Sequence, residues 1–439
     1  MGRENNMKKR LSILLAMSLL AGTLAGCGNQ ADTAATQTDD TTVLTDETKA
    51  ETDNNTNEKT DQETVEITAW HDNDEAMMNA LAEVVNEQLA GENITLRFEK
   101  KSDVTGQIKL YGTDSENGPD MYLFAHDSLG SFAEMGILEP VENLISSDKE
   151  ADLLPMTIEA ASYGGKQYLM PVYYETLLFM YNKDLWEGDI PSTTEDLYDY
   201  MVAHTDEAAG TYALVNQHSG AYNVAPFING FGGYIINESK EPGLNTQEFK
   251  DAVIYNSKFA KLQADGDYNT VTALFNEGKA AAIMGGPWLI SGIKEAGINL
   301  GIKSLAEFEL PNGEHLKPYS GVQCLGVLKY AAEKKHDAIV KVLEVLAQPE
   351  VSIELATEFN CAPANIKAYD EPAVAENEMI LAMKETAEVA VPMPNIPEMG
   401  VMWGPTESLL TAVNKSDADV DSAAEQFQNE ALTAIADMQ

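Results

Sequence analysis

VTALFNEGKAAAIMGGPW, residues 271–288, is the stretch that decides the fold of this chain. Its first part carries apolar residues at helical spacing, namely Val271, Leu274 and Phe275. Gly278 suits the left-handed position just past the end of a helix. The run AAAIM (280–284) is apolar throughout, as in a strand that is covered on both faces. The stretch therefore predicts a helix followed by a buried strand.

Trp288 follows this strand at a place where ligands often bind. Gly285 and Gly286 break the strand, and Pro287 fits the first position of a new helix, where its missing N–H is not needed. In open α/β sheets, ligands bind outside the carboxyl ends of the strands. Trp288 therefore either packs in the core, as most Trp side chains do, or offers its ring to a ligand.

The composition excludes some partners. Seventy-one acidic against 28 basic side chains give a net charge of −43, which repels nucleic acid and anionic lipid. We therefore expect no nucleic-acid partner. The length of 439 residues predicts two or three domains, and 44% apolar residues supply a large core.

The N-terminus carries a secretion signal. A basic start precedes the apolar run LSILLAMSLLAG (11–22), which is too short for a comfortable membrane span and ends on LAGC (24–27). This ending resembles the lipobox of bacterial lipoproteins. The resemblance implies a signal peptide at 1–26, lipid on Cys27 and anchoring at the extracellular face of the cell membrane. The alternatives are an ordinary signal peptide and an uncleaved anchor.

The next segment, 27–63, is predicted to be a disordered tether. After Cys27 it holds ten acidic residues, two lysines and no aromatic residue. Such a segment cannot bury enough apolar area to offset its ordering entropy, and its like charges keep it extended. We expect it to hold the folded part away from the cell surface.

Folding is expected to begin with a parallel βαβ unit. VEITAW (65–70) alternates as a strand, 75–90 has one broad apolar helical face, and ITLRFE (94–99) alternates again. Further on, MYLFA (121–125) is a buried strand. This order predicts an α/β fold.

The stretch 165–185 is predicted to form two strands separated by a polar break at Tyr174-Glu175-Thr176. Glu175 interrupts an otherwise apolar run, and a buried carboxylate is costly unless it is paired or hydrogen-bonded. It is either half of a structural ion pair or a ligand contact where the chain crosses between lobes.

Four passages together resemble the bacterial maltodextrin-binding proteins, the substrate receptors of ABC-type sugar importers. They are GPDMYLFAHD (118–127), PVYYETLLFMYNKDL (171–185), FNEGKAAAIMGGPW (275–288) and MPNIPEMGVMW (393–403). The resemblance runs in order from about residue 65 to 435. It implies a type II periplasmic-binding-protein fold, in which two α/β lobes are joined by a hinge and hold sugar between them.

The resemblance also implies lobe limits and site residues. Lobe 1 would comprise 64–174 and 321–373, and lobe 2 would comprise 175–320 and 374–439. The sugar contacts that carry over are Asp74, Phe124, Asp127, Glu175, Tyr222, Trp288 and Trp403. Trp288 is then expected to be a ligand platform. The protein would be a monomer that delivers maltooligosaccharide to the importer's transmembrane subunits, without a catalytic residue, cofactor or metal.

Six positions depart from the family pattern: Glu75, Ser128, Gly220, Ile290, Gly404 and Glu407. They replace Lys, Arg, Glu, an aromatic residue, Tyr and Arg, respectively. The loss of these donors and rings leaves open whether longer, branched or cyclic glucans are preferred.

Two rival functions remain at this stage. Asp74, Asp127 and Glu175 could include the carboxylate pair of a glycosidase, although the six His residues include no HExxH motif. The other rival is a receptor for a different solute. Cys324 and Cys361 could pair, but neither has metal-site spacing and we expect two buried thiols.

Overall fold

The computed structural model describes residues 64–262 and 266–438. The predicted signal peptide (1–26), lipidated Cys27 and tether (27–63) lie outside these residues.

The first sheet contains the predicted βαβ unit. Its main strand order is β13-β7-β12-β3-β1-β2, and β4 and β14 also pair with β12. β1 is parallel to both β2 and β3, whereas β12 is antiparallel to β3 and β7. Its strands are β1 (Val65–His71), β2 (Ile94–Lys100), β3 (Met121–Ala125), β4 (Leu138–Glu139), β7 (Leu169–Thr176), β12 (Tyr319–Leu328), β13 (Ala362–Pro363) and β14 (Val391–Pro392). β12 is buried at every position, including the polar residues Ser320 and Gln323.

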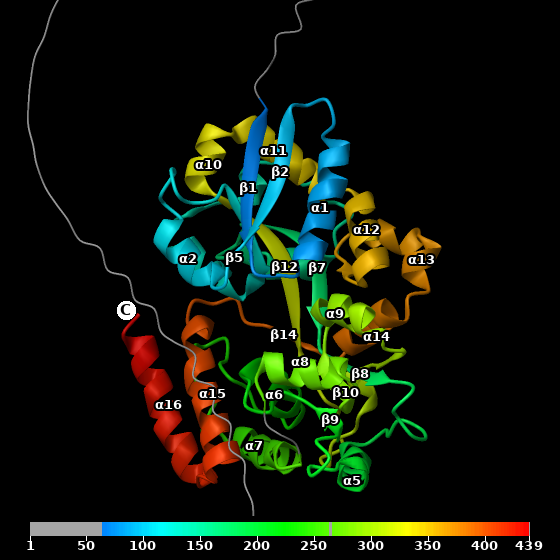
Figure 1. Ribbon diagram of the computed structural model, residues 1–439. Coiled ribbons are helices and arrows are strands. Elements are labelled where there is room, and N and C mark those ends of the chain that lie inside the picture. Colours follow the sequence, from blue (N-terminus) through cyan, green and yellow to red (C-terminus); the bar gives the residue numbers. More distant parts are fainter. Residues whose placement is uncertain (1–63, 263–265, 439) are drawn as a thin grey trace, which may run out of the picture. The chain divides into compact units, whose positions relative to one another are not determined.

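The helix of the βαβ unit, α1 (Glu75–Gln88), begins where a side chain caps it. The Asp74 carboxylate accepts a hydrogen bond from the Met77 backbone N–H at 2.9 Å, and Glu75 adds negative charge to the first turn. Four apolar residues on one face are buried: Met77, Met78, Leu81 and Val85. α1 contacts β2 and the late helix α12 (Pro349–Phe359), so residues far along the chain complete the packing of this sheet (Figure 1).

The second sheet contains the stretch that opened the sequence analysis. Its order is β11-β8-β10-β9, and its strands are β8 (Leu178–Asn182), β9 (Tyr212–Val215), β10 (Ala280–Gly285) and β11 (Leu300–Lys303). The predicted helix is α8 (Tyr268–Asn276), the predicted strand is β10, and a short 3-10 helix, η3 (Pro287–Leu289), leads into α9 (Ile290–Ala296). Gly278 has a φ of +69°, which confirms its left-handed position after α8.

The predicted break at Tyr174-Glu175-Thr176 is wrong. β7 continues through Thr176, because Glu175 pairs with Gly321 and Thr176 with Ser320 in the ladder with β12. The interruption falls at Leu177, between β7 of the first sheet and β8 of the second. A polar residue therefore does not end a strand when the neighbouring strand supplies its partners. The limits of the lobes stay a prediction.

The late segments contact both sheets. α14 (Glu378–Ala387) touches β7 of the first sheet as well as β8 and β11 of the second. β14 then pairs with the start of β12. The last two helices, α15 (Met399–Ser416) and α16 (Val420–Ala436), lie side by side and pack against α7 (Gln247–Ala260), while α15 also contacts α6 (Ala221–Gly230) (Figure 1).

The remaining elements complete the covering of the sheets and connect them. The helices are α2 (Val104–Tyr111), α3 (Leu129–Glu134), α4 (Pro155–Ala160), α5 (Thr194–His204), α10 (Lys329–Lys334), α11 (His336–Leu346) and α13 (Pro372–Ala375). The further 3-10 helices are η1 (His126–Ser128), η2 (Val141–Asn143), η4 (Leu305–Glu307) and η5 (Ile366–Asp370), and a small sheet pairs β5 (Ser162–Tyr163) with β6 (Lys166–Gln167).

One further expectation, on the cysteines, concerns the described residues. Cys324 and Cys361 are both free and buried, which confirms two thiols in place of a disulfide. Across 64–262 and 266–438, no helix combines the length and the apolar character that crossing a bilayer requires.

Candidate functional site

A cavity of about 240 Å³ brings together six of the seven predicted site residues. Its lining comprises Phe124, Ala125, Asp127, Glu175, Tyr222, Trp288, Gly321, Met393 and Trp403. These residues come from β3, η1, β7, α6, η3, β12, α15 and the segment before α15. Aromatic rings and carboxylates that are far apart in the sequence therefore meet at one place.

Trp288 reaches the cavity because the chain around it is shaped for its ring. A Cβ at Gly286 would lie 2.3 Å from Cζ3 of the Trp288 indole, so only glycine permits this close packing of ring on backbone. The side chain is half-buried, packs against the apolar core and also lines the cavity. The Tyr222 ring lies edge-on to it, with ring centroids 6.2 Å apart and planes inclined by 61°. The structure thus shows core contacts and an accessible face in the same residue.

Asp127 and Trp403 meet across the cavity. Both residues line the cavity, and Asp127 Oδ1 is buried and has no hydrogen-bond partner among the described residues. Burial raises the pKa of Asp127 to about 6, against the lowering effect of Trp403. Oδ1 of Asp127 is therefore an acceptor that a ligand hydroxyl could satisfy. Trp403 also packs edge-on against Tyr319, with ring centroids 6.4 Å apart.

Glu175 is only 8% exposed and is held by a neutral partner. Its Oε1 accepts a hydrogen bond from Nε2 of Gln323 at 2.8 Å. Within the described residues it makes no ion pair, so the ion-pair alternative is wrong for this part of the chain. Burial raises the pKa of Glu175 to about 7; Gln323 counteracts this and the charge of Asp72 adds to it.

Asp74 is the predicted site residue that does not line the cavity. Its carboxylate is engaged as the cap of α1. Asp72, two residues earlier in the same loop, interacts electrostatically with both Asp127 and Glu175. Burial raises the pKa of Asp72 to about 6, although its side chain keeps contact with solvent, which moderates that shift. Asp72 is itself exposed and does not line the cavity, so its charge acts on the two carboxylates from outside.

Sequence reasoning missed Asp72 and Gln323. The resemblance to the family implies a role for Asp74 and none for Asp72. Gln323 is a polar residue in a buried strand, the same signal that singled out Glu175. That signal could have pointed to Gln323, but not to which residue it would contact.

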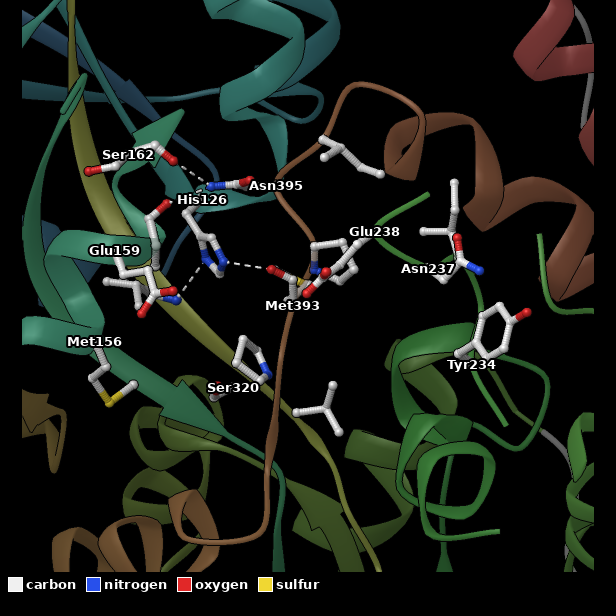
Figure 2. Close-up of a pocket in the computed structure, with 17 residues that line it drawn as sticks. His126, Met156, Glu159, Ser162, Tyr234, Asn237, Glu238, Ser320, Met393 and Asn395 are labelled. Atoms are coloured by element: carbon white, nitrogen blue, oxygen red, sulfur yellow. Dashed lines mark hydrogen bonds between the residues drawn. The ribbon is translucent and has the colours of Figure 1, made fainter. Parts of the chain in front are cut away.

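A larger cavity of about 660 Å³ lies on the opposite face of β12 (Figure 2). Ser320 and Val322 line it, whereas Gly321 between them lines the smaller cavity, and successive residues of a strand point to opposite faces. Its lining is mostly apolar and contains none of the seven predicted site residues. The predicted site residues therefore gather at the smaller of the two cavities.

His126 lines this larger cavity as a structural residue. Its Nδ1 accepts from the Val322 backbone N–H at 3.1 Å and its Nε2–H donates to the Met393 carbonyl at 2.9 Å (Figure 2). Burial lowers its pKa to about 4, so the ring is neutral at pH 7. The ring is therefore held between two backbone groups. In the described part of the chain, no group of three or more His, Cys, Asp or Glu residues is arranged to hold a metal ion.

Comparison with known proteins places the chain in a family. The family model of bacterial extracellular solute-binding proteins matches residues 80–382. Among relatives, the maltodextrin-binding protein MdxE of Bacillus subtilis is 32% identical over 348 residues, covering 73% of this chain and 81% of that protein. The maltotriose-binding protein of Pyrococcus abyssi is 28% identical and covers 83% and 82% of the two chains. The galactooligosaccharide-binding protein of Bacillus subtilis is 28% identical and covers 96% of each.

A solved structure shares the fold. The crystal structure of a cyclo/maltodextrin-binding protein complexed with maltotetraose matches with a TM-score of 0.70 at 23% identity, over 85% of this chain and 98% of that chain. This confirms the predicted type II periplasmic-binding-protein fold. Together these matches confirm a binding protein in place of a glycosidase: the chain belongs to the family of bacterial extracellular solute-binding proteins.

Proposed function

We propose that this protein captures maltodextrin-type α-glucan oligosaccharides outside the cell and delivers them to an ABC importer. The observation that carries the proposal is the cavity in which Tyr222, Trp288 and Trp403 surround the carboxylates of Asp127 and Glu175. The maltodextrin- and maltotriose-binding relatives support the same ligand class.

The chemistry of the cavity suits a pyranose ring. A pyranose has an apolar C–H face and a rim of hydroxyls. Aromatic faces cover the first, and carboxylate oxygens accept from the second through hydrogen bonds that are stronger than neutral ones. The buried Oδ1 of Asp127, which has no partner in the described structure, is the acceptor that gains most from a sugar hydroxyl.

Isothermal titration with maltotriose, maltoheptaose, cyclodextrins and cellobiose tests the ligand class. We expect heat of binding with the α-linked glucans and none with cellobiose, whose linkage presents the second ring differently. The sugar should be recovered unchanged from the mixture. Binding of cellobiose alone would contradict the proposal, and release of reducing ends would contradict a pure receptor.

Galactooligosaccharide is the second candidate ligand. The relative that binds it matches this chain over nearly the full length of both proteins. A galactooligosaccharide should therefore be added to the titration series. Tighter binding of this sugar than of any maltodextrin would replace the proposed ligand while keeping the receptor function.

Ligand binding is expected to close a hinge in a monomer. The cavity joins residues of the first sheet to rings of α6, η3 and α15, so a sugar that touches both groups binds the closed state more tightly. Small-angle scattering with and without saturating sugar should show a smaller radius of gyration in the complex. Equal radii would contradict closure, and a doubled mass would contradict a monomer.

Anchoring is proposed from the sequence LAGC at 24–27. Cys27→Ala should release the protein into the medium or leave it unprocessed, because this thiol would carry the lipid. A variant that still partitions with membranes after signal cleavage would contradict the anchor. Deleting residues 30–62 should change neither the sugar affinity nor the melting temperature, because such a tether adds nothing to the core.

A further inference from the structure

Gln323 is a polar side chain in the middle of a fully buried strand. It is 6% exposed, and all ten residues of β12 are buried. A buried amide is costly unless both its donor and its acceptor end find partners. Gln323 also stands where the pairing of β12 with β7 shifts register, a type of irregularity that re-aims side chains near functional sites.

Both ends of the amide are engaged. The Nε2 group donates to Oε1 of Glu175 at 2.8 Å, and the Oε1 atom accepts from Nδ2 of Asn73 at 3.3 Å. An ionised carboxylate only accepts hydrogen bonds, so Glu175 fixes which end of the amide faces it. Gln323 thereby joins three segments: β12, the end of β7 and the loop after β1.

The joined segments carry the acidic groups of the site. The loop that holds Asn73 also holds Asp72 and Asp74, and Glu175 lines the cavity. With Oε1 of Glu175 held by Gln323, the second carboxylate oxygen remains for a ligand. A neutral donor orients the carboxylate and leaves its negative charge in place. A lysine or arginine would neutralise that charge.

We propose that Gln323 is a positioning residue of the sugar site, which fixes the Glu175 carboxylate as a hydrogen-bond acceptor and ties it to the Asp72–Asp74 loop. This inference rests on the proposed function. If Gln323 had only a structural role, it would be enough for its amide to form both hydrogen bonds. A positioning role also requires that the negative charge stay on the side chain of residue 175.

The surroundings of Glu175 leave Gln323 as the group that favours its ionised form. Burial and the charge of Asp72 raise the pKa of Glu175, and the Gln323 hydrogen bond lowers it. The titratable groups that interact with Glu175 or lie around it are Asp72, Asp74, Asp127, Tyr173, Tyr222 and Cys361. All of them are neutral or negative, so none supplies a positive charge that would keep Glu175 ionised. Glu175 should therefore take up a proton as the pH falls, and this protonation should weaken sugar binding.

The test compares three variants with the wild type by titration with maltoheptaose between pH 5.5 and 8.5, together with melting temperature. Gln323→Leu removes both hydrogen bonds. The exchange Glu175→Gln/Gln323→Glu keeps an amide–carboxylate pair but moves the charge to β12. Asn365→Leu removes a buried amide outside the site, whose Nδ2 donates to the Ala347 carbonyl, and serves as the matched control.

We expect Gln323→Leu to weaken binding about tenfold at pH 7.5, as loss of one charge-assisted hydrogen bond does. Its affinity should also begin to fall at a higher pH than in the wild type, because the hydrogen bond that favours ionised Glu175 is gone. The exchanged pair should recover the melting temperature but not the affinity. Asn365→Leu should melt lower and bind normally.

Two outcomes would overturn the inference. One is wild-type affinity and pH profile in Gln323→Leu. The other is full recovery of affinity in the exchanged pair, which would show that any satisfied pair suffices. If Gln323→Leu does not fold, the exchanged pair alone decides. A wild type that binds none of the sugars would instead refute the proposed function, and this inference with it.

Discussion

The acids and the rings of the cavity come from different parts of the chain, although Asp127 is half-buried like the rings and only Glu175 is nearly fully buried. Asp127 and Glu175 belong to η1 and β7, beside or within the first sheet, and both have raised pKa values because of burial. Tyr222, Trp288 and Trp403 belong to elements outside that sheet and are half-buried, with edge contacts to other rings. The acids therefore cost stability in the free protein, whereas the rings contribute packing, and a ligand needs both.

Trp288→Ala should give the largest effect on binding. We expect a loss of about 2–4 kcal/mol in sugar affinity, since truncated hot-spot aromatics cost that much, and a smaller loss of stability from the core contacts that the ring makes. Titration and thermal unfolding of the same preparation separate the two effects. Were the ring chiefly a core residue, stability would fall by about 3–5 kcal/mol with affinity kept, and the contrast between rings and acids would disappear.

Glu175→Gln should raise the stability of the free protein at high pH and weaken sugar binding. The folded-state pKa of about 7 lies above the usual 4.5, so the folded protein binds this proton more tightly and stability falls as pH rises from about 4.5 through 7. The full penalty is about 3 kcal/mol above pH 8. The Gln variant should lose this part of the pH dependence in denaturant unfolding and bind sugar more weakly. If the pH dependence of stability were unchanged in the Gln variant, the pKa of Glu175 would not be raised in the free protein.

Trp403→Phe should have a smaller effect, because it keeps an aromatic face and removes only the indole N–H, which lowers the pKa of Asp127. Affinity should fall by about 1 kcal/mol. The pKa of Asp127 should rise further, since a polar group that favours its charged form is lost, and binding should weaken at a higher pH than in the wild type. NMR titration of the Asp127 carboxyl carbon checks this directly. An unshifted Asp127 would mean that the indole contributes only its face.

Met156→Ala in the larger cavity should have the smallest effect. Met156 is partly exposed and lines the larger cavity, which includes none of the rings and carboxylates of the smaller one (Figure 2). Sugar affinity should stay within about 0.5 kcal/mol of the wild type. A larger change, measured by titration, would mean that the ligand occupies the larger cavity.

The sequence alone determined the local elements and the residue types of the site. Alternation gave β1 and β2, helical periodicity gave α1 and α8, and GGPW placed Trp288 just after a buried strand. These features depend on neighbours within a few residues, where backbone preferences and side-chain spacing are decisive. The resemblance to a known family then added six residues that meet at one cavity.

Only the tertiary structure decided which groups act together. β7 runs through Glu175 because β12, about 145 residues later in the chain, supplies both the backbone ladder and the Gln323 amide. Asp74 is engaged in capping α1, and the charge of Asp72 in the same loop raises the pKa of Glu175. Such pairings follow from contacts between distant segments, which no local pattern encodes, and they set the pKa values and free acceptors on which binding depends.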